Sequence, residues 1–391
     1  MSCSSSDIIS NLLSDVLEQI LVCLTVQDAV RTSVLSRKWR YIWTTLPVLI
    51  FDDKFCRESV IRTRPDKLVM AIYKVLLLHD GPITKFTLAL ENLENSPEID
   101  QLIFSVSKNN DIREFTLHIW KGKPFKLPST LFSCQRLEHL SLCSCVFKPP
   151  PRFKGFTRLL SLELYEVFIA GDLLSSLTSN CPLLEELTLH CSTSYDYLEI
   201  GAPSLKYFEC EGLVRCICFR NTPHIEEVAI VLKGSRNQLG FNEGEISNSL
   251  MTLCGTPMVD LLILDHAYVK CVAASGVRER FPTYLARLTY LELNDICFGE
   301  SDEVSTVLYF IRSCPNLDEL LIRAFDGATA AIDTVSGTKA EMEFIKLLLA
   351  KSPMLETMGI TLKSMEVAEE SRIVKELTGF RPASPNVVIT F

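Results

Sequence analysis

The sequence lacks the short motifs that most often mark enzyme chemistry. Its 391 residues contain no glycine-rich phosphate loop, no G-x-S-x-G and no H-E-x-x-H. Basic residues are in the minority, with 39 Lys and Arg against 48 Asp and Glu. Duplex nucleic acids bind mainly through Lys and Arg that neutralise phosphates. An enzyme is therefore the least favoured class, and the charge balance argues against nucleic acid as a partner.

The sequence also has no apolar run of the ~18 residues that a membrane helix needs, and no secretory signal pattern at its start. Cysteine, in contrast, is abundant, with 15 residues. Several stand where a buried apolar residue is expected, such as Cys23, Cys181 and Cys314, and a free cysteine packs as a small hydrophobe. We expect reduced thiols, no membrane contact, and a location in the cytoplasm or nucleus.

Residues 7–47 predict a compact helical segment. Ser14 or Asp15 is the expected cap of the first helix, and Asp28 is placed in the first turn of the second. Apolar residues recur at helical spacing in three sets. The sets are Val16, Leu17, Ile20, Leu21 and Leu24, then Ala29, Val30, Val34 and Leu35, then Trp39, Ile42 and Trp43. Three short helices bury only part of this surface among themselves, so we expect the rest to pack against another surface.

From Leu46 onward the pattern apolar-x-x-apolar-x-apolar recurs at leucine-rich-repeat spacing. Most steps are 20 to 29 residues, and each unit of such a repeat supplies one strand and a helical or irregular return. The copies start at Leu46, Ile83, Ile112, Leu137, Leu159, Leu184, Leu205, Ile225, Val259, Leu288, Leu317 and Leu355. Pro182, Pro315 and Pro353 each follow an apolar helical stretch, and proline is expected to mark the corner from helix to strand.

The front segment resembles an F-box, because Leu12, Asp15 and Val16, the Asp28-Ala29 pair and the run Val34-Leu35-Ser36-Arg37 fall on its pattern. The tail, with its runs at 343–350 and 380–385, is similar to the FBD region of plant F-box/LRR proteins. The resemblance implies an α/β fold. It would comprise a three-helix F-box at 7–47, a leucine-rich-repeat solenoid at 48–320 with a curved parallel sheet and a helical outer face, and an FBD region at 321–391 that continues it.

The resemblance also implies a function. Similar proteins are non-catalytic substrate receptors of Skp–cullin–F-box ubiquitin ligases, which bring a target close to the ubiquitin-charged enzyme. The F-box would bind the Skp-type adaptor of the cullin complex, and the repeats and FBD region would bind a target protein, with no cofactor. The implied adaptor contacts are Leu12, Leu13, Val16, Leu17, Ile20, Leu21, Leu24, Asp28, Val34, Leu35, Ser36 and Trp39.

Two residues depart from the family pattern, which usually has proline at the position of Leu13 and often at that of Thr25. Proline in the first helical turn presets φ. This departure motivates one alternative function, a repeat scaffold that does not engage a ligase. A second alternative is a small-molecule co-receptor, since some F-box/LRR relatives hold a hormone together with their target.

The residues that flank the central apolar pair of each strand should point to the concave face. Among the repeats from Ile83 to Leu317 these positions hold nine acids, Glu114, Glu163, Glu186, Glu209, Glu211, Glu227, Asp265, Glu292 and Glu319, against the two bases Lys85 and Arg323. We hypothesise that this face binds a basic segment of the target. The alternative interpretation is that the acids only keep the sheet face soluble.

The pairs Cys143/Cys145 and Cys216/Cys218 do not have the spacing of a zinc finger, and no histidine follows at the usual interval. Alternate residues of a strand share a face, so we expect packing or surface thiols and no metal site. The segments 120–125 and 190–197, rich in aromatic and polar residues, are predicted as loops, where recognition residues often lie.

Overall fold

The computed structural model describes residues 12–37, 39–55, 65–94, 97–108, 111–214, 217–231, 259–274, 285–296, 301–324, 337, 339–351, 355, 357–360 and 367–390. The chain forms two compact units. The first contains residues 1–170 and 180–184, and the second contains residues 171–179 and 185–391. Each unit carries its own run of parallel strands. In the described part of the chain, no helix is long and apolar enough to cross a membrane.

The first unit holds five neighbouring parallel strands. In spatial order they are β1 (Val48–Asp52), β2 (Lys85–Glu94), β3 (Glu114–Lys121), β5 (His139–Cys143) and β7 (Ser161–Tyr165). A short second pair, β4 (Phe125–Lys126) with β6 (Cys145–Val146), is also parallel. Parallel strands need a crossover between them, and the segments between the predicted repeats provide it.

The second unit continues the pattern with eight neighbouring parallel strands. They are β8 (Glu186–Tyr195), β10 (Tyr207–Val214), β12 (Glu227–Val231), β13 (Leu261–Asp265), β14 (Tyr290–Ile296), β15 (Glu319–Ala324), β16 (Thr357–Gly359) and β17 (Val388–Thr390). A small parallel pair joins β9 (Leu198–Ile200) and β11 (Ile217–Phe219). The strands β16 and β17 extend the sheet into the predicted FBD region, as the sequence indicated.

Every predicted repeat becomes a strand of the sheet. In all twelve cases the strand begins two residues after the first apolar position of the pattern, as at Val48 after Leu46 and Thr357 after Leu355. The strand β17 was not predicted. The segment 190–197 was wrongly predicted as a loop, because β8 runs to Tyr195. The segment 120–125 is in part strand, since β3 ends at Lys121 and β4 begins at Phe125.

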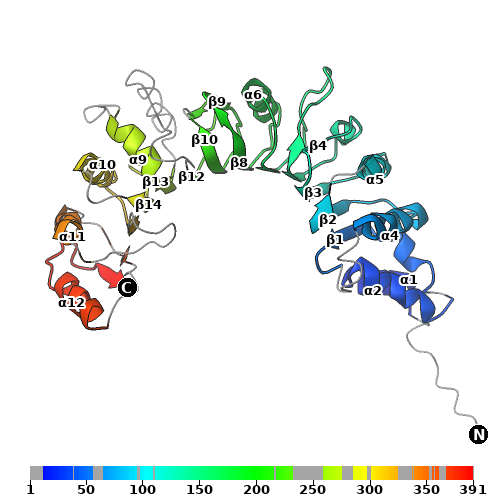
Figure 1. Ribbon diagram of the computed structural model, residues 1–391, viewed down its shortest axis with the longest axis horizontal. Helices are drawn as coiled ribbons and strands as arrows, with labels where there is room; N and C mark the ends of the chain where they lie inside the picture. The colour runs from blue at the N-terminus through cyan, green and yellow to red at the C-terminus, as the bar shows by residue number, and fades with distance from the viewer. Residues whose placement is uncertain are drawn as a thin grey trace, which may run out of the picture. The chain divides into compact units, whose positions relative to one another are not determined.

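The crossovers are mostly helical. The first unit has α4 (Pro65–Leu78), α5 (Pro97–Ser107) and a 3-10 turn at Leu131–Ser133. The second has α6 (Gly171–Ser179), α9 (His266–Ala274), α10 (Ser301–Arg312), α11 (Lys339–Lys351) and α12 (Val367–Thr378). Within each unit the helices lie on one side of the strands (Figure 1).

The core of each unit lies between strands and helices, because strand residues alternate between buried and more exposed positions. Phe86 and Phe115 are fully buried on neighbouring strands and stack with ring centroids 5.8 Å apart, and Phe51 lies 5.9 Å from Phe86. Each fully buried phenylalanine contributes about 1.5–3 kcal/mol relative to exposure. We call the side of the strands opposite this core the open face of each unit.

The predicted proline corners are confirmed at two sites. Pro182 stands between α6 and β8, and Pro315 between α10 and β15. The cysteine before each proline is buried. Cys181 Sγ accepts a hydrogen bond from the backbone N–H of Phe156 at 3.4 Å, so the thiol also satisfies a buried backbone donor. The third corner, at Pro353, lies outside the described residues.

Candidate functional site: a docking segment and the open strand faces

The front segment, residues 12–47, is built from two short helices and two 3-10 turns. They are α1 (Ser14–Val22), α2 (Val26–Arg31) and the turns Thr32–Val34 and Ile42–Thr45. Where a third helix was expected, the structure has the second turn. The helix begins one residue earlier than expected, since its N-cap position is not Ser14 or Asp15. The N-cap of α1 is Leu13, which makes no side-chain capping bond.

The second helix has the side-chain cap that the first one lacks. Thr25 is its N-cap, and Thr25 Oγ1 accepts a hydrogen bond from the backbone N–H of Asp28 at 3.2 Å. The Thr25 hydroxyl donates to Asp28 Oδ2 at 2.9 Å, and Asp28 Oδ1 lies 3.3 Å from Arg31. Asp28 therefore stabilises the start of α2. This role within the front segment explains an acid at this position of the F-box pattern, with no need for a contact to the adaptor.

We expect Thr25→Ala to lower the stability of the front segment by about 1 kcal/mol, because the first turn of α2 loses its cap. Thr25→Ser keeps the hydroxyl and should cost much less. Chemical unfolding of both variants, followed by amide hydrogen exchange in α2, measures the difference. Equal stability of the alanine and serine variants would contradict the capping role.

Three of the predicted adaptor contacts form the core of the front segment. Leu17, Leu21 and Trp39 are buried in one cluster with Ala29, Trp43 and Leu46, and Leu12 packs partly against it. Val75 of α4 packs on the same cluster, which joins the segment to the repeats of the first unit. These side chains hold the segment together and cannot contact a partner without opening the cluster.

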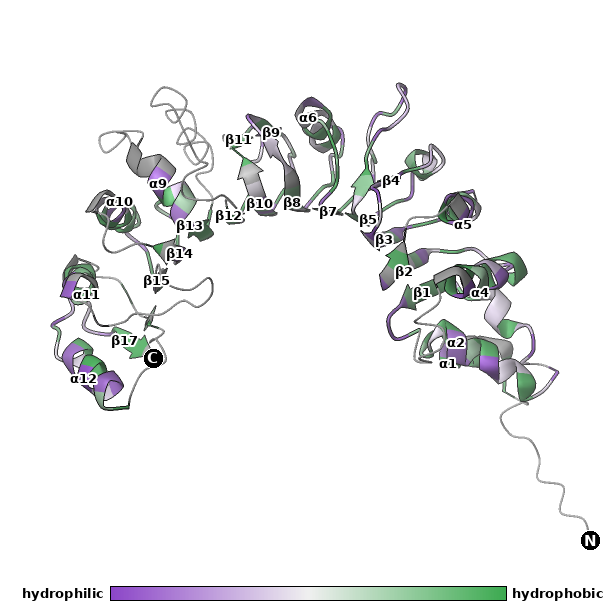
Figure 2. Ribbon diagram, viewed as in Figure 1, coloured by the Kyte–Doolittle hydropathy of each residue, from purple (hydrophilic) through white to green (hydrophobic). Residues whose placement is uncertain are grey.

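Six other predicted contacts are large apolar side chains exposed on the outside of the same segment. Val34 is 85% exposed, Leu13 74% and Leu35 62%. Val16, Ile20 and Leu24 are also exposed, so the outward face of α1 is apolar as well as its inward face. Figure 2 shows hydrophobic residues along both α1 and α2. Large apolar side chains left exposed in this number within one short segment are typical of a docking site.

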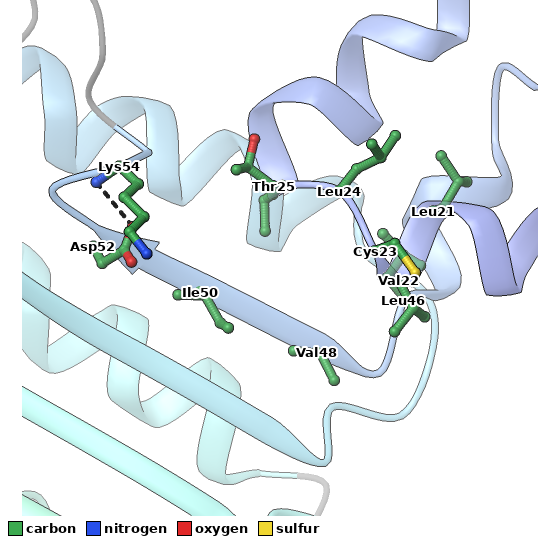
Figure 3. A pocket seen from close by; sticks show the side chains of 11 residues that line it. Leu21, Val22, Cys23, Leu24, Thr25, Leu46, Val48, Ile50, Asp52 and Lys54 are labelled. Atoms are coloured by element: carbon green, nitrogen blue, oxygen red, sulfur yellow. Dashed lines mark hydrogen bonds between the residues drawn. The ribbon is translucent and has the colours of Figure 1, made fainter.

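A cleft of about 280 Å³ lies beside this apolar surface. It is bordered by Val22 and Leu24 at the end of α1 and by Val48 and Ile50 on β1. Figure 3 shows Thr25 at the corner of the cleft, with the β1 side chains opposite. The exposed apolar surface of α1 thus reaches the first strand of the sheet.

The acidic residues predicted on the strands differ in their surroundings. Glu114 lies 2.6 Å from Lys85 on the next strand, which neutralises it. Glu209 and Glu211 flank His190, each with an oxygen 3.3 Å from a ring nitrogen. Glu186, Glu227 and Glu319 begin their strands and are exposed.

Two of the predicted acids are buried. Asp265 accepts a hydrogen bond from the backbone N–H of Tyr268 at 3.0 Å, in the first turn of α9, and is therefore a helix cap. Glu292 accepts a hydrogen bond from the Tyr290 hydroxyl at 2.8 Å. Tyr207 donates to Glu209 in the same way at 2.7 Å. This Tyr-x-Glu pairing was not predicted, although its spacing of two residues along a strand is visible in the sequence.

Six of the nine described cysteines are buried like packing residues, whereas Cys23 is exposed and Cys191 and Cys218 are partly exposed. Burial raises the pKa of the Cys134 and Cys181 thiols to about 11 and that of Cys314 to about 12, so all three stay protonated at neutral pH. In the part of the chain that the structure describes, no three His, Cys, Asp or Glu side chains lie together as a metal-binding group. Cys216 of the second Cys-x-Cys pair lies outside that part.

Comparison with known proteins agrees with this architecture. The F-box domain model matches residues 9–51, and the model of the LRR repeats of FBD-associated F-box protein At5g56370 matches residues 101–322. F-box/FBD/LRR-repeat protein At1g13570 from Arabidopsis thaliana is 35% identical over 99% of each chain. The chain belongs to the F-box/FBD/LRR-repeat family. FBD-associated F-box protein At5g56370 from the same plant is 28% identical over 90% of this chain and 89% of its own.

The family assigns general roles to the two parts of the molecule. F-box domains generally bind Skp-type adaptors, and F-box/LRR proteins are generally non-catalytic adaptors in protein interaction. The front segment is thus the F-box, and the strand repeats are its leucine-rich region. The exposed apolar set of the F-box, defined as Leu13, Val16, Ile20, Leu24, Val34 and Leu35, provides a candidate adaptor-binding surface.

Proposed function

We propose that this chain is a substrate-recognition subunit of a Skp–cullin–F-box ubiquitin ligase and acts in the cytoplasm or nucleus. The exposed apolar set of the F-box is the observation that supports it. Six large apolar side chains stay exposed around a cluster that is already well packed. Burying apolar surface at ~25 cal/mol per Å² would drive docking of an adaptor there. We divide the chain into the F-box at 7–47, the repeats at 48–320 and the FBD region at 321–391.

In this proposal the repeats and the FBD region bind the target, and the chain itself makes no bond. The ligase gains rate because target lysines are held near the ubiquitin thioester. The open face of the second unit favours a basic target segment, since Glu186, Glu209, Glu211, Glu227 and Glu319 lie there. Among the described strands of this unit, one base, Arg323 of β15, stands at an alternating position on that face, so the acids are in clear excess.

Co-expression of the full chain with a plant Skp-type adaptor tests the proposal. We expect the two proteins to purify as one stoichiometric complex on size-exclusion chromatography. Addition of a cullin–RING module should then give a larger assembly that contains both proteins. A chain that elutes alone and folded, at concentrations where a known F-box protein binds the same adaptor, would contradict a ligase role.

Leu13 favours a second candidate, an interaction scaffold without a ligase, because the family usually has proline there. The backbone of Leu13 has φ −62° and ψ 148°, which proline can adopt. We expect Leu13→Pro to stabilise the F-box by about 0.4–1 kcal/mol, since it restricts the unfolded chain.

The same variant separates the two candidates. If this chain is a ligase receptor, Leu13→Pro should tighten an adaptor affinity that the natural chain already has. Leu13→Ala serves as the control for the lost leucine side chain. Adaptor binding that appears only in the proline variant would favour the scaffold, and a lower unfolding midpoint would show that proline does not fit.

A further inference from the structure

An aromatic cluster lies on the open face of the first unit, across three neighbouring strands. His118 on β3 and Tyr165 on β7 pair in register with Cys143 of the strand between them. Because the Cys143 side chain is small, the two rings meet above it with centroids 5.7 Å apart. Trp120, two residues after His118, lies 5.8 Å from it on the same face. Figure 2 labels β3, β5 and β7 in this order.

A chain of hydrogen bonds holds a carboxylate beside these rings. The Ser141 hydroxyl donates to Glu163 Oε2 at 2.7 Å. Ser141 Oγ therefore accepts from His118 Nε2 at 2.9 Å, which places the imidazole proton on Nε2. The Tyr165 hydroxyl also approaches Glu163 Oε2, at 3.4 Å. Both hydroxyls use the same carboxylate oxygen, so the position of the carboxylate is fixed by neighbours on two strands.

The cluster carries negative charge. Burial lowers the pKa of His118, an effect that Glu163 only partly offsets, so the imidazole is neutral at pH 7. One other ion pair joins charged strand residues on this face among the described residues. It is formed by Lys85 and Glu114, which neutralise each other near the start of their strands. The carboxylate of Glu163 therefore faces the rings without a cation among its described partners.

Aromatic faces beside a carboxylate attract a cation that can also stack. Trp120 is 53% exposed, which is unusual for so large an apolar side chain and leaves its ring accessible. Arginine fits this combination better than lysine, because its planar guanidinium stacks on rings and bonds a carboxylate through a fork of N–H groups. A nucleobase would also stack, but its phosphates would be repelled by Glu163.

We propose that Tyr165 and Glu163 bind an arginine side chain of a bound protein segment and that Trp120 contacts the part of the segment beside it. Tyr165 contacts the guanidinium plane, Glu163 accepts its N–H groups, and Ser141 and His118 position the carboxylate. Trp120 lies on the other side of His118 from Glu163. The inference rests on the proposed function in that the segment would belong to the target. It places one specific arginine-binding site on the first unit, whereas the acids of the second unit attract basic segments only through their negative charge.

The three tryptophans of the chain give a direct readout. Trp39 and Trp43 are buried in the F-box, and Trp120 is the third. The probe is the peptide acetyl-Gly-Gly-Arg-Arg-Gly-Gly-amide, titrated into the full chain at low salt. The matched control peptide carries citrulline, which has nearly the shape of arginine but no charge. We expect a saturable change in tryptophan emission with arginine and binding of citrulline that is at least about tenfold weaker.

Variants locate the site. Glu163→Gln should weaken the arginine peptide about tenfold or more, since it removes the charge and keeps the shape. Glu98→Gln, at an exposed position of helix α5 in the same unit and away from the open face, is the matched control and should leave binding nearly unchanged. Trp120→Phe should abolish the fluorescence change while calorimetry still detects weaker binding.

Several outcomes would overturn the proposal. They are equal affinity for arginine and citrulline peptides, unchanged binding by Glu163→Gln, and tighter binding of an oligouridylate than of the arginine peptide. A lysine peptide that binds as tightly as the arginine peptide would exclude the guanidinium-specific site. Adaptor co-purification of Glu163→Gln is measured in parallel. The adaptor does not enter the peptide titration, so failure of one proposal is distinguishable from failure of the other.

Discussion

Leu35→Asp is expected to weaken binding of a Skp-type adaptor by at least about 30-fold, the effect of losing one interface hot spot. Leu35 and its neighbour Val34 follow α2 and are 62% and 85% exposed, so aspartate at either position meets water in the unbound chain. In a complex the same carboxylate would be buried without a partner, which is strongly unfavourable. Biolayer interferometry with purified adaptor measures the loss.

The control is a change of the same kind outside the F-box. Val367 at the start of α12 is 77% exposed, and Val367→Asp introduces the same charge on a helix of the second unit. We expect it to bind the adaptor like the natural chain. If Leu35→Asp and Val34→Asp both keep full affinity while the circular dichroism is unchanged, the exposed apolar set is not the docking surface.

Trp39→Ala is expected to destabilise the F-box by about 3–5 kcal/mol, because it empties the centre of the buried cluster. Trp39→Phe is the matched control. The indole Nε1 of Trp39 is buried without a hydrogen-bond partner among the described residues, so its removal sacrifices no hydrogen bond. We expect phenylalanine to cost less than about 1.5 kcal/mol.

Hydrogen exchange gives the measurement for this pair of variants. In Trp39→Ala the amides of α1 and α2 should exchange much faster, while those of β10 and β14 in the second unit keep their protection. Adaptor binding should fall in proportion to the fraction of unfolded F-box. Unchanged protection of α1 would show that Trp39 contributes little to the cluster. The two substitutions thus separate residues that contact the adaptor from residues that support the contact.

The repeats were predictable because the side-chain period of a strand is fixed at two residues. Leu187 and Leu189 had to share one face of β8, and the apolar residue two positions before the strand marked its start. The F-box was harder to predict. Its first helix is apolar on both sides, and the sequence did not distinguish Leu17 and Leu21, which are buried, from Val16 and Ile20, which are exposed.

The contacts of the open-face residues could not be predicted from spacing within one strand. Asp265 follows the same alternation as the other acids, but a helix begins one residue later and uses its carboxylate as a cap. The contacts of His118 with Ser141 and Tyr165 depend on the register between strands that are 23 and 47 positions apart in sequence. Register between distant segments is a property of the folded sheet.

The constant position at which each strand begins has a consequence for how such chains can diverge. Within single units the distance between successive strand starts ranges from 20 residues (Tyr207 to Glu227) to 38 residues (Glu319 to Thr357), yet each pair stays in register. Insertions and deletions in the returning segments are therefore tolerated. One residue added inside a strand would instead exchange its buried and exposed sides. Related gene copies can thus differ in the length and sequence of the segments between strands, while the parallel sheet and its register stay the same.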